Sequence, residues 1–475
     1  MGTRLERSPW IPGYGWWAML AAVIAAGLIG NWAIAAGLLV FLLVQVARPF
    51  DFVVAFLVVV AGASFVSNTG GHLTFQLSLL TGAILLMFAC YVLSNHDRVL
   101  SLSRTTLTRL LLLYLVLSVG NAARGLLAGY PPRYWGLELI ALLALESALV
   151  VGNAFQPQRD LRLAMVGLIG IGFAAAIRGL VAFWIEAIHT GSTYTVAVPG
   201  IVGLLLVNLG LRSGTRRAAF GWVVLSLPLF LHQLVTFGRG LWTGCFAGLA
   251  ASLLIFGGIG RGSGARWGRA GSVVAMLVGL GVVGALQAVV IFGQADLLED
   301  AGTRLTSITS TETGLETRSN MIRLWEYATV IDLIKQAPWF GYGVGFTFPG
   351  KEPFSGKVAD QWAVHQNFLH VWLKQGVVGL VLFIWMLWAA IALGVREARR
   401  RADPWESTWF ATIAVTTVFL AVFSLSNFPF ALVNETFLLA LLWGGGMAMT
   451  RKGLISFRWS PRQESRIGEP PRGRV

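Results

Sequence analysis

The chain has 475 residues, of which 56% are hydrophobic and 12% are charged, and its formal net charge is +14. A soluble protein of this length needs more charged residues to cover its surface, so the composition excludes a soluble globular enzyme. Apolar runs of about 17–25 residues, the length of a membrane-spanning helix, recur along the chain. Because these runs are unbroken rather than alternating, they favour helices over the strands of a membrane barrel. The sequence therefore predicts an all-α, polytopic transmembrane helical bundle.

The predicted spans follow one another along the chain and leave one long gap. They lie near 16–30, 32–46, 52–66, 73–93, 107–123, 135–153, 161–187, 196–211, 218–236, 240–256, 271–291, 364–394, 406–426 and 431–449. The first two are divided only at Gly30–Asn31 and can form a hairpin that dips into the membrane, so about 12–14 spans are expected. The predicted organisation is an N-terminal bundle over 1–291, a large loop over 292–363 and C-terminal helices over 364–450. The basic tail, 451–475, is predicted to be disordered.

Basic residues concentrate in one set of loops and in the tail. Among them are Arg212, Arg216, Arg217, Arg261, Arg266, Arg269, Arg396, Arg399, Arg400, Arg401, Arg451, Lys452, Arg458, Arg462, Arg466, Arg472 and Arg474. Because cytoplasmic loops are enriched in Lys and Arg, these loops and both chain termini are predicted to be cytoplasmic. The positive charge therefore sets topology and attracts anionic membrane lipid, and it does not indicate a nucleic-acid partner.

The gap at 292–363 is predicted to be one large loop on the outer face of the membrane. Within it, Asn320–Ala337 has the pattern of an amphipathic helix that ends before Pro338. Its broad apolar face contains Ile322, Trp325, Ala328, Val330 and Leu333. The glycines that follow, Gly341, Gly343 and Gly345, predict a flexible turn. Long loops with helix signals are usually functional, so this loop is the first place to look for a site.

Cysteine usage and the N-terminus exclude two further features. Cys90 and Cys245 both lie inside apolar runs, so neither a disulfide framework nor a thiol metal site is predicted. The first apolar run follows Arg4 and Arg7 without a small-residue cleavage site. It is therefore expected to be an ordinary span rather than a cleaved signal peptide.

Arginines at the outer face form the first group of candidate site residues. Arg239 lies between two glycines at the outer start of a span, where a ligand can approach closely. Arginine forks match phosphate oxygens in two-point contacts. Arg318 and Arg323 flank the start of the amphipathic helix. The alternatives are a headgroup-binding role for Arg239 and a solvated helix face for the other two.

His365 is the candidate base, since it is predicted at the outer start of a span and histidine titrates near neutral pH. The alternative is a capping or interfacial histidine. His370 lies five residues further along, off the same helical face, and is expected to be structural.

Two ionisable residues are predicted to lie deep within the bundle. Glu146 and Arg178 are each about 14–17 Å from the outer ends of adjacent spans, at 1.5 Å per residue. Charges at that depth are costly unless they are paired. One hypothesis is an ion pair between them, and the other is that each faces a separate water-filled cavity.

Three sequence elements, in order, resemble motifs of the bacterial O-antigen ligase and polymerase superfamily. Phe237-Gly-Arg-Gly240 is similar to the family's Ser-Arg-Gly element, with Gly238 in place of the serine. Arg323-Leu-Trp-Glu, followed by Pro338-Trp-Phe-Gly-Tyr-Gly-Val-Gly345, resembles its Arg…Pro-x-x-Gly-x-Gly element. His365-Gln-Asn-Phe-Leu and Gly376-Val-Val-Gly379 resemble its His-Asn/Ser…Gly-x-x-Gly element, with Gln366 inserted. The resemblance covers roughly Leu231 to Leu393.

The resemblance implies a fold similar to GT-C-type membrane glycosyltransferases and an active site on the periplasmic face of a bacterial inner membrane. It implies catalytic roles for His365, Arg239 and Arg323. Substrate contacts are implied for Arg239, Arg318, Arg323, Asn367 and Gly343. The spacing to Pro338 favours Arg323 over Arg318 as the family arginine.

The implied reaction is inverting transfer of a glycan from a polyprenyl pyrophosphate, undecaprenyl pyrophosphate, to an acceptor hydroxyl, without a metal or other cofactor. The acceptor is another glycan, the lipid A core or a protein, and the product is lipopolysaccharide O-antigen, exopolysaccharide or a related surface polymer. Membrane lipid is a further partner, and chain-length regulator and flippase proteins are candidate partners.

Other classes of membrane protein fit the sequence less well. A transporter or flippase of lipid-linked sugars predicts inverted repeats and has little need for a long outer loop that carries Arg and His. A peptidoglycan polymerase would use a loop carboxylate such as Asp296, Glu299 or Asp300, whose context does not resemble that family. A membrane scaffold explains none of the three motifs.

Overall fold

The computed structural model describes residues 52–64, 105–186, 197–236, 239–257, 315–351 and 358–450. Several predicted features lie outside these residues: the spans near 16–30, 32–46, 73–93 and 271–291, Cys90, most of the loop before residue 315, and the tail. The total number of spans therefore stays a prediction.

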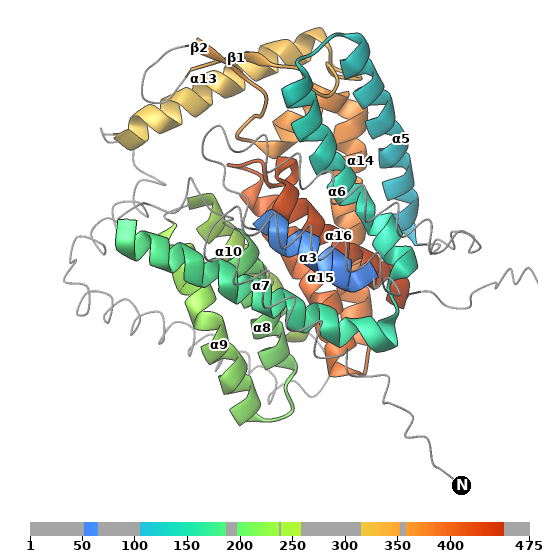
Figure 1. Cartoon of the computed structure of the whole chain (residues 1–475), viewed down its shortest axis with the longest axis vertical. Helices are drawn as coiled ribbons and strands as arrows, with labels where there is room; N and C mark the ends of the chain where they lie inside the picture. Colours follow the sequence, from blue (N-terminus) through green and yellow to red (C-terminus); the bar gives the residue numbers. More distant parts are fainter. Residues whose placement is uncertain are drawn as a thin grey trace, which may run out of the picture.

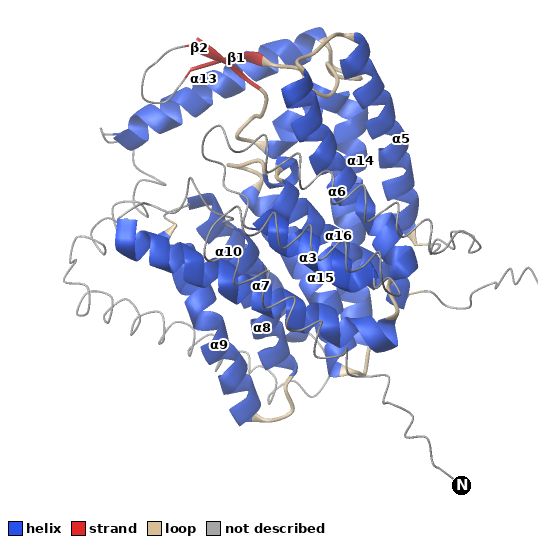
Figure 2. Cartoon of the chain, viewed as in Figure 1, coloured by secondary structure: helices blue, strands red, loops and turns tan. Residues whose placement is uncertain are grey.

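The described chain is almost entirely helical (Figures 1 and 2). The helices are α3 (Phe52–Ser64), α5 (Thr106–Leu127), α6 (Pro132–Ala154), α7 (Pro157–Glu186), α8 (Ala197–Arg212), α9 (Arg216–Val235), α10 (Arg239–Gly257), α13 (Leu315–Gln336), α14 (Asn367–Arg400), α15 (Pro404–Phe423), the 3₁₀ turn η2 (Pro429–Ala431) and α16 (Val433–Met449). Within the described residues, five helices are long and apolar enough to cross a membrane: α5, α6, α7, α14 and α15. This confirms an all-α polytopic membrane protein.

Helix boundaries follow from capping residues in the sequence. The Thr105 side chain accepts a hydrogen bond from the Thr108 backbone N–H at 3.1 Å and begins α5. Asp403 accepts two backbone N–H groups at 2.9 Å and begins α15, with Pro404 in the first turn. These contacts satisfy donors that a helix start leaves unpaired.

Small residues allow close packing inside the bundle. A Cβ on Gly444 of α16 would come within 2.5 Å of the Cβ of Val151 on α6, so only glycine fits at this crossing. Helices in membranes associate through such small-residue contacts rather than through a hydrophobic driving force.

One end of the bundle, here called the loop end, is covered by α13 and a short hairpin (Figure 1). The hairpin pairs β1 (Phe348–Lys351) with β2 (Val358–Gln361) in antiparallel fashion, with Phe348 opposite Gln361. A small second core, formed by Val330, Ile334, Phe348, Val364 and Leu373, joins α13 and the hairpin to the start of α14. The predicted amphipathic segment is thus confirmed as α13, which begins five residues earlier than expected.

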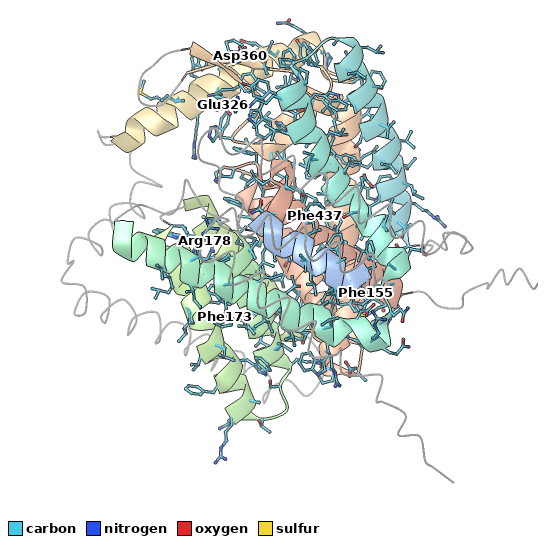
Figure 3. All side chains as sticks on the ribbon, viewed as in Figure 1. Phe155, Phe173, Arg178, Glu326, Asp360 and Phe437 are labelled. Atoms are coloured by element: carbon cyan, nitrogen blue, oxygen red, sulfur yellow. The ribbon has the colours of Figure 1, made fainter. Side chains whose placement is uncertain are left out.

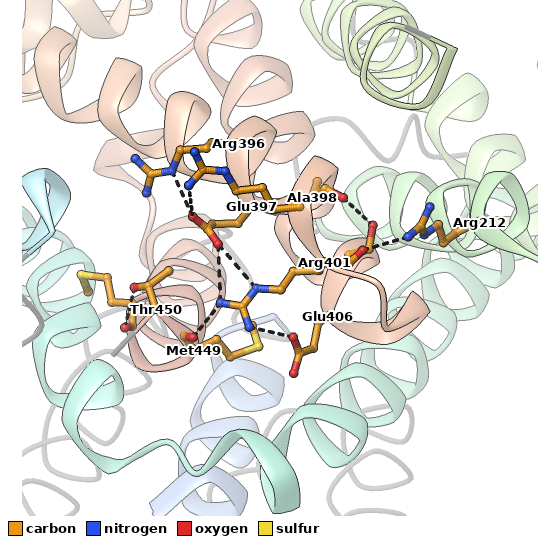
Figure 4. A network of polar contacts seen from close by, with 11 residues as sticks. Arg212, Arg396, Glu397, Ala398, Arg401, Glu406, Met449 and Thr450 are labelled. Atoms are coloured by element: carbon orange, nitrogen blue, oxygen red, sulfur yellow. Dashed lines mark hydrogen bonds and ion pairs between the residues drawn. The ribbon is translucent and has the colours of Figure 1, made fainter. Parts of the chain in front are cut away.

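The opposite end of the bundle, here called the arginine end, is tied together by a polar network (Figure 4). Arg401 pairs with Glu397 at 3.4 Å and with Glu406 at 2.9 Å, and it donates to the Met449 carbonyl at 2.9 Å. Arg212 donates to the Arg401 carbonyl at 2.8 Å. One arginine side chain therefore joins the ends of α14, α15 and α16, and its backbone joins them to α8.

Candidate functional site

His365 is held by a buried carboxylate on α13. The Glu326 Oε2 lies 2.7 Å from the His365 Nδ1, and its Oε1 accepts the His365 backbone N–H at 2.6 Å. Glu326 is 1% exposed, whereas the His365 side chain is 37% exposed. With Nδ1 directed at the carboxylate, the other ring nitrogen, Nε2, is the one left to meet a ligand. This pair is the arrangement in which a carboxylate orients a histidine base.

The spacing of residues on α13 explains how the helix reaches this histidine. Arg323, Glu326 and Tyr327 recur at positions i, i+3 and i+4, and Val330 and Ile334 continue the same face into the small core. Glu326 lies on α13 at the loop end (Figure 3). Burial raises the pKa of Tyr327, and the nearby Arg323 guanidinium partly opposes that rise. Arg323 therefore shares the face of α13 that carries Glu326.

The segment after α13 fills a break in α14. At Gly376 the backbone leaves the helical conformation, with φ of 70°. The carbonyls of Leu373 and Lys374 accept the backbone N–H groups of Tyr342 at 2.9 Å and Gly343 at 2.8 Å. After the break, the Val377 and Val378 N–H groups donate to the carbonyls of Pro338, at 2.8 Å, and Trp339, at 3.4 Å.

This pairing explains why two of the sequence motifs contain glycine. A Cβ on Gly376 would lie 2.1 Å from the Trp339 carbonyl oxygen, and a Cβ on Gly341 would lie 2.5 Å from the Leu373 carbonyl oxygen. Both glycines also have a positive φ, which other residues adopt only at a cost. The turn predicted after Pro338 is present, and its backbone groups are hydrogen-bonded to α14.

A buried ion pair fixes the same loop to the bundle. The Lys374 Nζ contacts the Glu138 Oε1 and also donates to the Phe346 carbonyl. The other Glu138 oxygen accepts the Gly345 N–H at 2.7 Å. Both side chains are almost fully buried, at 3% and 4% exposed. Buried charges require such pairing, so α6, α14 and the glycine loop are held in one arrangement.

The start of α10 approaches the same region through the α15–η2 turn. A Cβ on Gly240 would lie 2.1 Å from the Ser426 Oγ, so the beginning of α10 packs directly on this turn. The turn also binds α14, since the Asn367 N–H donates to the carbonyls of Ser424 at 2.9 Å and Asn427 at 3.1 Å. The Arg239 backbone therefore lies next to the turn that holds the helix following His365.

Three other residues singled out in the sequence, Asn367, Gly343 and His370, are not half-exposed beside a carboxylate as His365 is. Asn367 is fully buried, and its side-chain amide has no hydrogen-bonding partner among the described residues. Gly343 donates its N–H to the Lys374 carbonyl of α14, and a Cβ on Gly343 would lie 3.3 Å from backbone atoms of α5, so this glycine is packed between the two helices. His370 is buried against the Trp362 ring, as expected for a structural residue. The side chains of Arg239 and Arg318 lie outside the described residues.

The proposed Glu146–Arg178 ion pair does not form. Both Glu146 carboxylate oxygens are buried without a hydrogen-bonding partner among the described residues. Arg178, labelled on α7 in Figure 3, takes part in another interaction. Counting along two adjacent helices gives depth but not rotation about the helix axis, so equal depth did not make the two groups meet.

One known protein family matches the part of the chain that contains the Glu326–His365 pair. The family described as O-antigen ligase matches residues 224–384. These residues are similar to an O-antigen ligase domain. The domain begins within α9 and ends within α14, so it contains Arg239, α13, the glycine loop and His365. The resemblance predicted from the motifs is confirmed. No curated protein matches the chain.

The sequence did not reveal three residues that matter for this site: Glu326, Lys374 and Glu138, of which the first two lie within the matched residues. Glu326 stands in the quoted Arg323-Leu-Trp-Glu motif, and its three-residue spacing from Arg323 was the available signal. Lys374 lies inside the predicted span near 364–394, and its sequence context did not point to a partner. Glu138 lies in α6, before the matched residues, and nothing in its local sequence links it to Lys374. Among the described residues, no cluster of His, Cys, Asp and Glu is arranged to hold a metal ion.

Proposed function

We propose that this protein is a membrane glycosyltransferase that moves a glycan from a polyprenyl pyrophosphate to an acceptor hydroxyl during surface polysaccharide biosynthesis. The observation that carries the proposal is the Glu326–His365 pair inside the O-antigen ligase domain. A histidine that is oriented on one side and accessible on the other is suited to remove a proton from an incoming hydroxyl.

In the proposed reaction, His365 accepts the proton of the acceptor hydroxyl at Nε2. The hydroxyl oxygen forms a bond to the anomeric carbon, and the bond from that carbon to the pyrophosphate oxygen breaks. The leaving polyprenyl pyrophosphate keeps the electron pair of that bond. Attack opposite the leaving group inverts the anomeric centre. Glu326 stabilises the imidazolium that forms and keeps its orientation, and the imidazolium releases the proton to water before the next cycle.

Arg323 and Arg239 are proposed to bind the pyrophosphate. Arg323 lies on the face of α13 that carries Glu326, one helical turn away. Arg239 begins α10, whose first residues contact the turn that anchors α14. Guanidinium groups match pyrophosphate oxygens in two-point contacts and stabilise the charge that develops on the leaving group. Because pyrophosphate is already a stable anion, the proposal requires no metal ion.

The proposed orientation places the loop end in the periplasm and the arginine end in the cytoplasm. The arginine end contains Arg212, Arg396, Arg399, Arg400 and Arg401, and the positive-inside rule assigns such an end to the cytoplasm. Donor, acceptor and active site would then meet on the outer face of the inner membrane.

Glycan transfer can be tested directly with purified protein. The protein is given a polyprenyl-pyrophosphate glycan and candidate acceptors, with no nucleotide or metal ion, and the products are sized by mass spectrometry. Longer lipid-linked chains would identify a polymerase, and glycan on lipid A core or on protein would identify a ligase. If the protein consumes no donor from a panel of glycans but moves lipid-linked sugar across vesicle membranes, it is a transporter and the proposed enzymatic function is wrong.

A further inference from the structure

A groove lies along the last turns of α14, at the arginine end and away from the proposed active site. Its volume is about 500 Å³. The groove is lined by Trp388, Ile391, Ala392, Val395, Arg396, Arg399 and Arg400. The lining thus changes along the helix axis from an apolar wall to a cluster of guanidinium groups. A ligand that matches it has an apolar part and an anionic part arranged in the same order.

The length of α14 places this change at the edge of the membrane. From the break at Gly376, the continuous helix Val377–Val395 is about 28 Å long at 1.5 Å per residue, close to the roughly 30 Å hydrocarbon core of a bilayer. Beside the break, Trp339 and Phe340 are 66% and 61% exposed, as is typical of aromatic residues at a membrane interface. Arg396 therefore lies at the headgroup level of the leaflet on the other side of the membrane from the break at Gly376.

The guanidinium groups of the groove are only partly neutralised by the protein. Within the described residues, ion pairs from Arg396 at 3.0 Å, Arg400 at 4.0 Å and Arg401 at 3.4 Å all converge on Glu397. Arg399 donates to the Leu254 carbonyl at 3.5 Å, a neutral group. Glu406 pairs with Arg401, whose side chain does not line the groove. The cluster therefore carries a surplus of positive charge.

The neighbouring sequence does not supply the missing negative charge. The segment 258–291 follows α10, whose Leu254 contacts Arg399. It contains Arg261, Arg266 and Arg269 and has neither Asp nor Glu. In this stretch of sequence, every charged residue is therefore basic.

We propose that the groove binds one anionic phospholipid. Its phosphate contacts Arg396, Arg399 and Arg400, and an acyl chain lies along the apolar wall that begins at Trp388, which is 67% exposed. Arginine–phosphate contacts give charge-assisted hydrogen bonds, and the apolar wall lies at the depth of lipid tails. A free phosphate would use only the basic half of the groove. A zwitterionic lipid carries a positive group beside its phosphate, so it would not neutralise the surplus positive charge of the groove.

The test measures lipids retained by the full-length protein. Wild-type protein in detergent is titrated with phosphatidylglycerol or phosphatidylcholine, and bound lipid is counted by native mass spectrometry. The proposal predicts at least one retained phosphatidylglycerol with about tenfold preference over phosphatidylcholine, a difference of about 1.4 kcal/mol. Inorganic phosphate at millimolar concentration should displace little of it.

A matched pair of variants locates the lipid. Arg399→Gln/Arg400→Gln should lose the preference, whereas Arg216→Gln/Arg217→Gln, which removes the same charge from the start of α9, should keep it. Equal retention by the two variants, equal retention of the two lipids by wild type, or displacement by free phosphate would each overturn the proposal. The wild-type comparison needs no variant, so equal retention of the two lipids would overturn the proposal even if the first variant fails to fold.

Discussion

Lys374 of α14 and Glu138 of α6 form a buried ion pair that also binds both ends of the Gly345–Phe346 peptide segment. The two side chains come from helices far apart in sequence and meet where the glycine loop enters the bundle. The loop in turn follows α13, which carries Glu326. The membrane helices therefore fix the position of the carboxylate that orients His365.

Removing one partner of this ion pair should destabilise the protein strongly. Lys374→Met leaves Glu138 buried without its cation, and we expect a loss of about 3–5 kcal/mol in the free energy of unfolding. Glu138→Gln/Lys374→Met removes both charges and should recover part of that loss. Chemical denaturation in detergent measures both. Lys335→Met, in an exposed pair with Asp332, is the control and should change stability by less than about 1 kcal/mol. Equal effects for Lys374→Met and Lys335→Met would contradict the role of the buried pair.

The break in α14 should not tolerate a side chain. Gly376→Ala places a methyl group against the Trp339 carbonyl in a backbone conformation that alanine disfavours, and should cost about 1–3 kcal/mol. It should also lower transfer activity, because the loop that leads to α13 is displaced. Gly120→Ala on α5, where the added Cβ meets nothing within 4 Å, is the matched control and should be neutral or slightly stabilising. Thermal unfolding of the two variants side by side gives the comparison.

Glu326 should matter for the rate of transfer more than for donor binding. Glu326→Gln keeps the size of the side chain but removes the charge that stabilises the His365 imidazolium, so we expect kcat to fall about 100-fold or more with little change in donor KM. Asp332→Asn removes an exposed carboxylate from the same helix and should leave kcat unchanged. A larger effect on KM than on kcat would assign Glu326 to binding instead of orientation.

Arg323 should show the opposite pattern. Arg323→Gln removes a proposed pyrophosphate contact, so we expect a several-fold or greater rise in the donor KM. Arg323→Lys keeps the charge but loses the two-point geometry and should recover only part of the affinity. Steady-state kinetics with varied donor concentration separates these cases. An unchanged KM in both variants would place the pyrophosphate elsewhere.

Much of the architecture could be predicted because it depends on local sequence. Apolar runs gave α5, α6, α7, α14 and α15 as spans, and the amphipathic pattern before Pro338 gave α13. His365 and Arg239 were placed at helix starts by the same reasoning. These features follow from periodicity and from the residues that begin or end a helix.

Features that depend on contacts between distant segments could not be predicted. Glu326 meets His365 across 39 residues, and Glu138 meets Lys374 across 236. The glycines after Pro338 indicated only a turn. The carbonyl groups that accept hydrogen bonds from this turn lie at the break in α14, more than 30 residues further along the chain. The Glu146–Arg178 pair failed for the same reason: the sequence gives the depth of each charge but not the direction it faces.

The most direct test of the central claim compares wild type with His365→Ala in a single-turnover transfer assay, at equal folded amounts and saturating donor. If His365 is the base, the rate of glycan transfer should fall by about 10²–10⁴-fold in His365→Ala, because nothing then removes the proton of the acceptor hydroxyl, while donor binding should be retained. Transfer by His365→Ala at the wild-type rate would show that His365 is not the base and that the Glu326–His365 pair is a structural contact.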